Sequence, residues 1–250
     1  MREGIGFFFG CTVAVLLKEL YEDLKRVLDK AQVEYEPLGV DQCCGIPLVL
    51  SGYIDEAKKH AGRIVEEIEG KDVDTLVTAC PHCYIAFSKE YPETLGVRVP
   101  FRVQHFTQLA DRLIDEKKIK VEKGVDLRVT YHDPCYLGRM GDRIYEEPRR
   151  IIRALPGVEL KELSLNREDA TCCGGGGLLR ASFPILALEA AKEKIEMQLE
   201  PLGVDAVVSS CPFCYMNLRE GLEMRERPLK VYNLEQLLAR SLEGGVEGER

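Results

Sequence analysis

Ten cysteines fall into one pattern that is written twice along the chain. Each copy has a single cysteine, then a Cys-Cys-Gly, then a Cys-Pro-x-Cys. The first copy comprises Cys11, Cys43-Cys44-Gly45 and Cys80-Pro81-His82-Cys83. The second comprises Cys135, Cys172-Cys173-Gly174 and Cys211-Pro212-Phe213-Cys214. Because each copy uses five cysteines and none is left over, the repeat indicates a thiolate-rich site in each half of the chain.

Composition limits the partners that such a chain can have. Its 250 residues, 45% hydrophobic and 30% charged, can bury the core of one large domain or two small ones. The net charge of -8 argues against nucleic acid, which requires a basic face. No stretch approaches the roughly 20 apolar residues of a membrane span, so we expect no direct membrane insertion.

The chain start, MREGIGFFFGCTVAVLL, is only superficially like a signal peptide, because Gly6, Gly10 and Cys11 interrupt its apolar run. We interpret it as a strand that leads into a helix in a cytoplasmic protein, associated with a membrane only through partners. In a reducing cytoplasm structural disulfides are disfavoured, and adjacent cysteines rarely bond to each other. Metal or cluster binding is therefore the favoured use of the cysteines.

The first half alternates predicted strands and helices. The predicted strands are Ile5–Phe9, Gln32–Leu38, Thr75–Thr78 and Val97–Val103. The predicted helices are one capped by Thr12, one over Tyr53–Ile68 and ended by Gly70, one opened by Pro81, and one over Phe106–Glu116.

The second half repeats this order after a charged segment, Lys117–Gly124, which we take as the domain boundary. The predicted domains are residues 1–122 and 123–250, each within normal domain size. The predicted strands are Leu127–Tyr131, Val158–Leu163, Ala206–Ser209 and one around Lys230–Tyr232. The predicted helices include Glu147–Leu155, opened by Pro148, and Ser182–Leu199, with Pro184 in its first turn.

Alternation of strands and helices predicts an α/β fold: two similar Rossmann-like domains with parallel sheets, produced by internal duplication. In such sheets ligands lie outside the carboxyl ends of the strands. All three cysteine groups of each half follow a predicted strand, so one edge of each sheet can gather all five thiols. Helices that begin there would favour thiolates and an anionic cluster.

Five cysteines exceed the needs of the common thiolate sites. A structural zinc takes four ligands in a tetrahedron, and ordinary iron–sulfur clusters also take four. The ferredoxin run C-x2-C-x2-C-x3-C-P is absent from the sequence. The residues alone therefore favour two iron–sulfur sites of unusual shape, with zinc in one or both sites as the alternative.

The complete double motif resembles the tandem CCG, or cysteine-rich, domains of the heterodisulfide reductase B subunit, which also occur in the related D subunit. The resemblance covers nearly the whole chain. It implies a noncubane [4Fe-4S] cluster in each half. The implied ligands are Cys11, Cys43, Cys44, Cys80 and Cys83 for the first cluster, and Cys135, Cys172, Cys173, Cys211 and Cys214 for the second.

The same resemblance implies a function. The chain would be the catalytic subunit of a heterodisulfide reductase-type complex, an oxidoreductase that reduces a small-molecule disulfide such as CoM-S-S-CoB between the two clusters. Because the sequence has no ferredoxin motif and no dinucleotide fingerprint, activity would require partners. These would be a ferredoxin-type iron–sulfur subunit and a flavin-containing electron-input subunit.

Two other functions are compatible with the motif. CCG domains also occur in glycerol-3-phosphate, lactate and succinate oxidoreductase subunits, so the chain could be an electron-relay or quinone-linked subunit that binds no disulfide. The other alternative is a zinc-bound structural module.

Glycines beside the cysteines are candidate cofactor-binding residues, because a Cβ there would hinder close approach of the backbone to a cluster or substrate. They are Gly45 in the first half and Gly174, Gly175 and Gly176 in the second. The alternative for the glycine run, which continues to Gly177, is a flexible loop.

The four histidines receive different interpretations. His132 is the candidate catalytic proton donor to a leaving thiolate, against the alternative of a polar loop cap. A ligand role for His82 is disfavoured because Phe213 holds the matching place. His105 matches Asn233, and both fit a helix N-cap. His60 lies on a Lys/Glu-rich helix, and we expect it to be solvated.

Arg139, Arg143 and Arg180 lie close to the second cysteine group in the sequence. Their guanidinium groups could bind a carboxylate or phosphate of a substrate. Pairing with the many acidic residues of the chain is the alternative.

Overall fold

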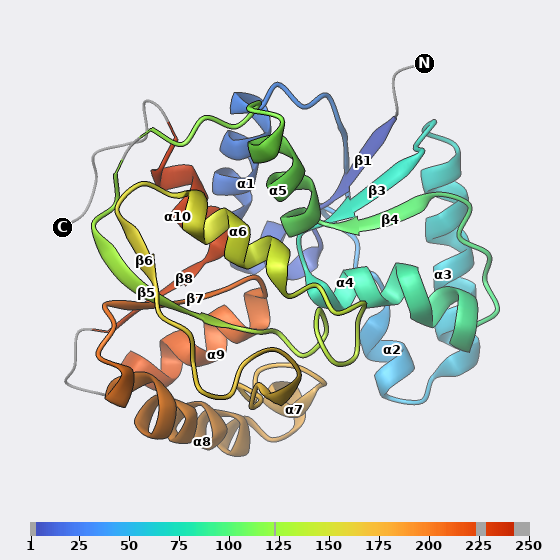
Figure 1. The fold of residues 1–250 in the computed structure, drawn as a ribbon. Helices are drawn as coiled ribbons and strands as arrows, with labels where there is room; N and C mark the ends of the chain where they lie inside the picture. Colours follow the sequence, from blue (N-terminus) through green and yellow to red (C-terminus); the bar gives the residue numbers. More distant parts are fainter. Residues whose placement is uncertain (1–3, 123, 224–228, 243–250) are drawn as a thin grey trace.

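Two four-stranded parallel sheets form the framework of the computed structural model, which describes residues 4–122, 124–223 and 229–242. The first sheet has the strand order β2-β1-β3-β4, and the second has the order β6-β5-β7-β8 (Figure 1). The strands are β1 (Ile5–Phe8), β2 (Glu36–Leu38), β3 (Thr75–Thr78), β4 (Arg102–His105), β5 (Leu127–His132), β6 (Val158–Leu160), β7 (Ala206–Ser209) and β8 (Lys230–Asn233).

Matching strand order and register confirm the predicted α/β fold of two similar halves. Phe8 at the end of β1 lies opposite Thr78 of β3, and His132 at the end of β5 lies opposite Ser209 of β7. The central strands β3 and β7 are buried along their whole length. Helices cover both faces of each sheet, as a parallel sheet requires.

Each half carries five α-helices in the part of the chain that the structure describes. Those of the first half are α1 (Lys18–Lys30), α2 (Ile46–Leu50), α3 (Ile54–Glu69), α4 (Pro81–Ile85) and α5 (Phe106–Asp115). Those of the second half are α6 (Glu146–Ala154), α7 (Leu179–Ser182), α8 (Pro184–Lys194), α9 (Pro212–Glu223) and α10 (Leu234–Arg240). Wider π-helical stretches occur at Thr12–Leu16, Ala86–Thr94 and Ile195–Leu199, and short 3-10 turns at Arg167–Asp169 and Glu200–Leu202.

Four helices lie between the two sheets and give the halves a common core (Figure 1). Helix α1 packs against α10, and α5 packs against α6, so the first helix of each half meets the last helix of the other. Leu24 of α1, Leu109 of α5, Ile151 of α6 and Leu238 of α10 belong to one buried cluster. The outer faces of the sheets carry α3 and α4 in the first half and α8 and α9 in the second.

Several predicted boundaries are wrong. Thr12 does not cap a helix: it is the first residue of the π-helical stretch, and the preceding Cys11 has helical backbone angles and no side-chain cap bond. The second strand is confined to Glu36–Leu38, and the fourth lies at Arg102–His105 rather than Val97–Val103.

The long helix predicted over Ser182–Leu199 is present but starts later, at Pro184, its predicted first-turn proline, and continues through the π-helical stretch to Leu199. Helix α7 ends at Ser182, Phe183 has a φ of -138°, and α8 starts at Pro184. The proline explains the break, since its ring disfavours helical angles in the residue before it. The predicted proline at the start of the helix after Cys80 is confirmed, with Pro81 as its first residue.

Both predicted N-caps are confirmed. His105 accepts a hydrogen bond from the backbone N–H of Thr107, and the amide oxygen of Gln108 accepts one from the N–H of His105. At the start of α10, Asn233 holds the N-cap position and its N–H donates to the amide oxygen of Gln236 in the same way. The predicted domain boundary falls at Lys123, outside the described residues, and stays a prediction.

Candidate metal centres

The cysteines of each half gather at the carboxyl edge of its sheet. Cys11 comes shortly after β1, Cys80 follows β3 and precedes α4, and Cys211 stands in the equivalent place between β7 and α9. All ten cysteines are free thiols. The sequence-based expectation that all three cysteine groups of each half share one edge therefore agrees with the structure.

Thiols of the first set hydrogen-bond to one another, and these bonds lower the pKa of some thiols and raise that of others. A hydrogen bond from Cys43, and then one from Cys83, lower the pKa of Cys44 to about 5. Burial raises the pKa of Cys80, but bonds with Cys83 and His82 outweigh it and lower the pKa to about 6. The hydrogen bond given to Cys43 raises the pKa of Cys11.

In the second set, too, hydrogen bonds between thiols lower the pKa of some cysteines and raise that of others. Bonds from Cys135 and then Cys173 lower the pKa of Cys172 far below its ordinary value, whereas donating to Cys172 raises the pKa of Cys135 and brings that of Cys173 to about 12. Burial opposes ionisation of Cys211, yet bonds with Cys214 and His82 lower its pKa to about 5.

Clustered thiols fit a cationic metal centre, because neighbouring thiolates cannot all ionise unless a cation offsets their repulsion. Backbone N–H groups add donors to the sulfurs. Gly45 N lies 3.4 Å from Cys43 Sγ, Gly174 N lies 3.3 Å from Cys172 Sγ, and Gly175 N lies 3.4 Å from Cys173 Sγ. Iron–sulfur clusters are held by Cys thiolates and tuned by such hydrogen bonds, so both sets suit them.

The glycines also meet a packing constraint that the sequence did not reveal. A Cβ on Gly174 would lie 2.5 Å from the carbonyl oxygen of Ala187, and one on Gly175 would lie 2.4 Å from that of Phe213. A Cβ on Gly176 would lie 2.9 Å from the His82 ring. The glycine run is thus packed against α8, α9 and the first half, and is no loose loop.

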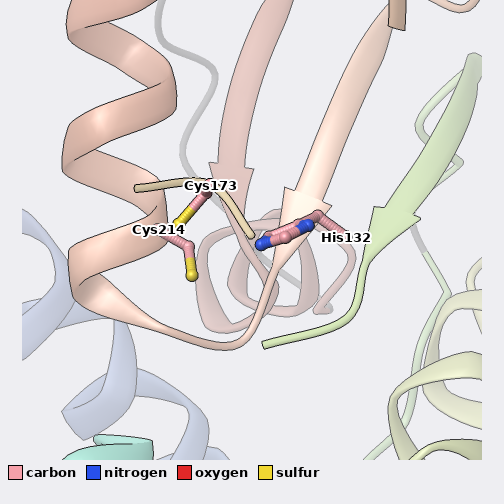
Figure 2. A group of neighbouring side chains, drawn as sticks. All are labelled: His132, Cys173 and Cys214. Carbon is pink, nitrogen blue, oxygen red and sulfur yellow. The ribbon is translucent and has the colours of Figure 1, made fainter. Parts of the chain in front are cut away.

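His132 lies beside two cysteines of the second set. One ring nitrogen and the sulfurs of Cys173 and Cys214 all lie within 4.8 Å of one another, and the three side chains point toward one another (Figure 2). The ring is 1% exposed, and its Nδ1 has no hydrogen-bond partner among the described residues. Burial, followed by the charge of Lys194, lowers the pKa of His132 well below its ordinary value.

His82 links the two cysteine sets, which sequence reasoning missed. Its Nδ1 lies 4.0 Å from Cys80 Sγ of the first set. Burial lowers its pKa, but hydrogen bonds with Cys211 and then Cys80 outweigh burial and raise the pKa to about 10. The ring stacks on Tyr136 at 4.1 Å between centroids and meets Phe213 at 4.8 Å.

The cavities at the two sets share His82 but differ in size. The first, lined by Cys11, Cys44 and Phe213 among others, has a volume of about 40 Å³. The second, lined by Cys135, Cys172 and Tyr136 among others, has a volume of about 270 Å³. The two pockets are therefore not equivalent.

His60 is not simply solvated, contrary to expectation. It is partly buried, its Nε2 lies 2.7 Å from the carbonyl oxygen of Cys43, and its ring lies where a Cβ on Gly45 would be. The helical position on α3 looked exposed, but the Cys-Cys-Gly turn folds back over it.

The three candidate arginines separate in the structure. Arg139 lines the larger cavity and donates a hydrogen bond to the Glu168 carbonyl oxygen at 3.3 Å. Arg143 lies 3.9 Å from the Glu168 carboxylate. Arg180 pairs with Glu220 and donates to Asn217. Only Arg139 of these three lines the cavity at the second set.

A buried ion pair holds the loop that carries Cys135. Arg149 is fully buried and donates to both carboxylate oxygens of Asp133, at 2.7 and 2.8 Å, and to the carboxylate of Glu162 at 2.7 and 2.9 Å. Asp133 also accepts the backbone N–H of Arg167 at 2.8 Å. These bonds fix Asp133, which directly follows His132.

Comparison with known families agrees with this geometry. The CCG cysteine-rich domain family matches residues 5–88 and 129–219, one match in each half. The chain belongs to the CCG cysteine-rich domain family. Each match begins at or just after the first residue of the first strand of its half and extends past the last cysteine group.

Characterised relatives are components of several oxidoreductases. The chain is 37% identical over 250 residues to the D subunit of dihydromethanophenazine:CoB–CoM heterodisulfide reductase from Methanosarcina acetivorans, covering 98% of this chain and 61% of the relative. It is 36% identical to the B subunit of fumarate reductase (CoM/CoB) from Methanothermobacter marburgensis, over 94% of this chain and 45% of the relative. It is 31% identical to the C subunit of anaerobic glycerol-3-phosphate dehydrogenase from Escherichia coli, over 95% and 60% respectively.

The chain therefore spans about three fifths or less of the length of these relatives. The expected likeness to a heterodisulfide reductase is correct, but the likeness is shown to three D subunits and not to a B subunit. Among solved structures, an aspartate racemase of Picrophilus torridus matches 94% of this chain and 91% of its own, with a TM-score of 0.43 and 13% identity. None of the described helices is long and apolar enough to cross a membrane.

Proposed function

We propose that this chain is the iron–sulfur subunit of a heterodisulfide reductase-type complex. In this proposal it reduces a small-molecule disulfide at two noncubane [4Fe-4S] clusters, each held by one five-cysteine set. The electrons come from a ferredoxin-type iron–sulfur partner, supplied in turn by a flavin-containing subunit. The names of the relatives support an oxidoreductase component of this kind.

The observation that carries the proposal is the meeting of both cysteine sets at His82. This side chain belongs to the first half, yet it lines the cavities of both sets and hydrogen-bonds with Cys80 and Cys211. Two sites that share a side chain can act on two adjacent sulfurs, as a disulfide presents them. A pure electron relay does not require two cavities, one at each set, that share a lining side chain.

Protein residues would bind and orient the substrate. The cavity at the second set is large enough to admit part of a small molecule, and Arg139 at its lining can bind an anionic group. The clusters, when bound, would supply the electrons. One disulfide accepts two electrons and two protons, its S–S bond breaks, and two thiols leave.

His132 is the proposed proton donor to a leaving thiolate. Its lowered pKa makes the charged ring rare at neutral pH. The role therefore requires that the negative charge of a bound thiolate raises this pKa again, as nearby opposite charges do.

The electron-relay alternative also has support. One relative is named as the C subunit of a glycerol-3-phosphate dehydrogenase, and another as an EtfAB:quinone oxidoreductase. In that case the same clusters pass electrons to or from a quinone-linked partner and no disulfide is cleaved. A zinc-bound structural module is the third candidate, and metal analysis separates it from the others.

Anaerobic turnover tests the proposal directly. The purified chain, with its clusters assembled, is mixed with reduced viologen and a small heterodisulfide, and viologen oxidation is followed. We expect thiol release at one disulfide per two viologens oxidised. Oxidation of the viologen with no thiol release, in protein with full iron, would favour the relay function instead.

A further inference from the structure

Lys194, the last residue of α8, is a buried cation beside the second cysteine set. It is 3% exposed. Its Nζ donates to the Oγ1 of Thr171 at 2.9 Å, to the carbonyl oxygen of Thr171 at 3.3 Å and to Gln198 Oε1 at 3.1 Å. Within residues 4–122, 124–223 and 229–242, no carboxylate lies within ion-pair distance of this ammonium group.

A buried charge is costly unless an opposite charge offsets it. Burial lowers the pKa of Lys194, and the groups that raise it again are Cys173, Cys214 and Cys172, followed by Asp133. Asp133 is already paired with Arg149. Lys194 donates to Thr171, which directly precedes Cys172, so the charge that this ammonium group would face is that of the second cysteine set once a bound cluster keeps its thiols ionised.

The first half has no such cation in the matching place. Helices α3 and α8 show the same burial pattern: Ala57, Ala61 and Ile64 correspond to Ala187, Ala191 and Lys194. Ile64 is 3% exposed, like Lys194, and packs in the apolar cluster that contains Cys44, Cys80 and Cys83. At this position the second set therefore has a buried positive charge that the first set lacks.

A second apolar side chain at the first set is replaced by a polar one at the second set. Phe8 and His132 hold equivalent positions at the ends of β1 and β5, and both are 1% exposed. The first set thus faces a phenyl ring and an isoleucine, where the second faces an imidazole and an ammonium group.

We propose that Lys194 is a redox-tuning residue that gives the second cluster a higher reduction potential than the first. Net charge around a cluster is one of the features that set its potential, and a fixed cation stabilises the reduced form, which carries one more negative charge. The inference rests on the two clusters of the proposed function. One electron that leaves a reduced first cluster then reduces the second, beside the larger cavity.

An anaerobic redox titration followed by electron paramagnetic resonance tests this. The chain with eight iron should show two reduction steps. Lys194→Gln, which can keep bonds to Thr171 and Gln198 but has no charge, should lower the higher step alone. We expect at least a tenfold change in the equilibrium constant, about 59 mV for a one-electron couple. Lys194→Arg keeps the charge and should leave both steps in place.

Lys192→Gln is the matched control, because Lys192 lies on the same helix but pairs with Glu189 near the surface. It should move neither step. Equal potentials in the unaltered chain, an unchanged higher step in Lys194→Gln, or a shift of the lower step would each overturn the inference.

If a Lys194 variant fails to bind one of its clusters, its iron content still tests the inference. Loss of about half the iron in Lys194→Gln, with full iron in Lys194→Arg, would show that the charge holds the anionic cluster and support the inference. Loss of iron in both Lys194→Gln and Lys194→Arg would mean that cluster binding depends on the shape of the lysine side chain and not on its charge, and would overturn the inference. An unaltered chain without iron would sink the proposed function first, which distinguishes the two failures.

Discussion

Arg149 determines how firmly the loop around Cys135 is held. Its replacement by Met leaves Asp133 buried with an unpaired carboxylate, because that carboxylate is only 3% exposed. Loss of one partner of a buried ion pair costs about 3–5 kcal/mol. We expect Arg149→Met to lower the free energy of unfolding by this amount in denaturant titration.

The neighbouring Arg150 is the matched control, since its side chain is 53% exposed and pairs with Asp111 on the surface. Arg150→Met should cost about 1 kcal/mol or less. Equal losses for the two variants would contradict a special role for the buried pair.

Glu235 makes stability depend on pH. Burial, the largest cause, raises its pKa from 4.5 to about 8. Between these values only the folded chain keeps the proton, so the free energy of unfolding should fall as pH rises, by about 1.4 kcal/mol per pH unit from this group. Glu235→Gln should flatten the dependence between pH 5 and pH 8, measured by denaturant titration at each pH. An identical slope in the variant would refute this assignment.

The cysteines that can bind metal could be identified from the sequence. Residues whose role depends on contacts between distant parts of the chain could not. The cysteines stand out by spacing alone. The sequence disfavours a role for His82, because Phe213 replaces it in the repeat. In the structure the two side chains contact each other, and Phe213 lines the cavity of the first set. Lys194 looked like one of many helical lysines, since burial of a single charged position is set by packing.

The glycine run is the element that most limits substitution around the second set. Gly175→Ala would place a Cβ 2.4 Å from the Phe213 carbonyl oxygen on rigid backbone. Overpacking of this kind costs about 1–3 kcal/mol, and we expect thermal unfolding to show it, together with weaker cluster retention.

Gly62, inside α3, is the control, because a Cβ there meets nothing within 4 Å. Gly62→Ala should stabilise the chain by about 0.5–1 kcal/mol. A Gly175→Ala variant as stable as the unaltered chain would show that the loop can move away from α9.

Strands and long amphipathic helices could be predicted where the spacing of hydrophobic residues and the position of turn residues indicated the same element. Strands at Thr75–Thr78 and Ala206–Ser209 lie as expected, because buried parallel strands read as short apolar runs. The helix predicted over Ser182–Leu199 starts at Pro184 instead, because a proline disfavours helical angles in the residue before it. The short α2 was missed, since five residues carry too little periodicity.

At the scale of the whole molecule, the halves share one core. Side chains of α1, α5, α6 and α10 pack together between the sheets, with Leu24, Ile151 and Leu238 fully buried there. A chain of residues 1–122 alone would expose the inner faces of α1 and α5. We expect this fragment to aggregate or to lack a cooperative unfolding transition, measured by circular dichroism and size-exclusion chromatography.

Co-expression of residues 123–250 is the control for that fragment and should restore a soluble complex. A monomeric, cooperatively folded first fragment would contradict the common core. The duplication itself was evident from sequence, whereas the pairing of α1 with α10 and α5 with α6 depends on how the two halves dock, which no local pattern encodes.

In the proposed function each cysteine set holds an iron–sulfur cluster. The most direct measurement is iron, acid-labile sulfide and zinc per chain in protein kept free of air, with Cys44→Ala and Cys173→Ala beside the unaltered chain. Two [4Fe-4S] clusters predict about eight iron and eight sulfide, falling by about half in either variant. About two zinc and no sulfide would contradict the account and make the chain a structural zinc module.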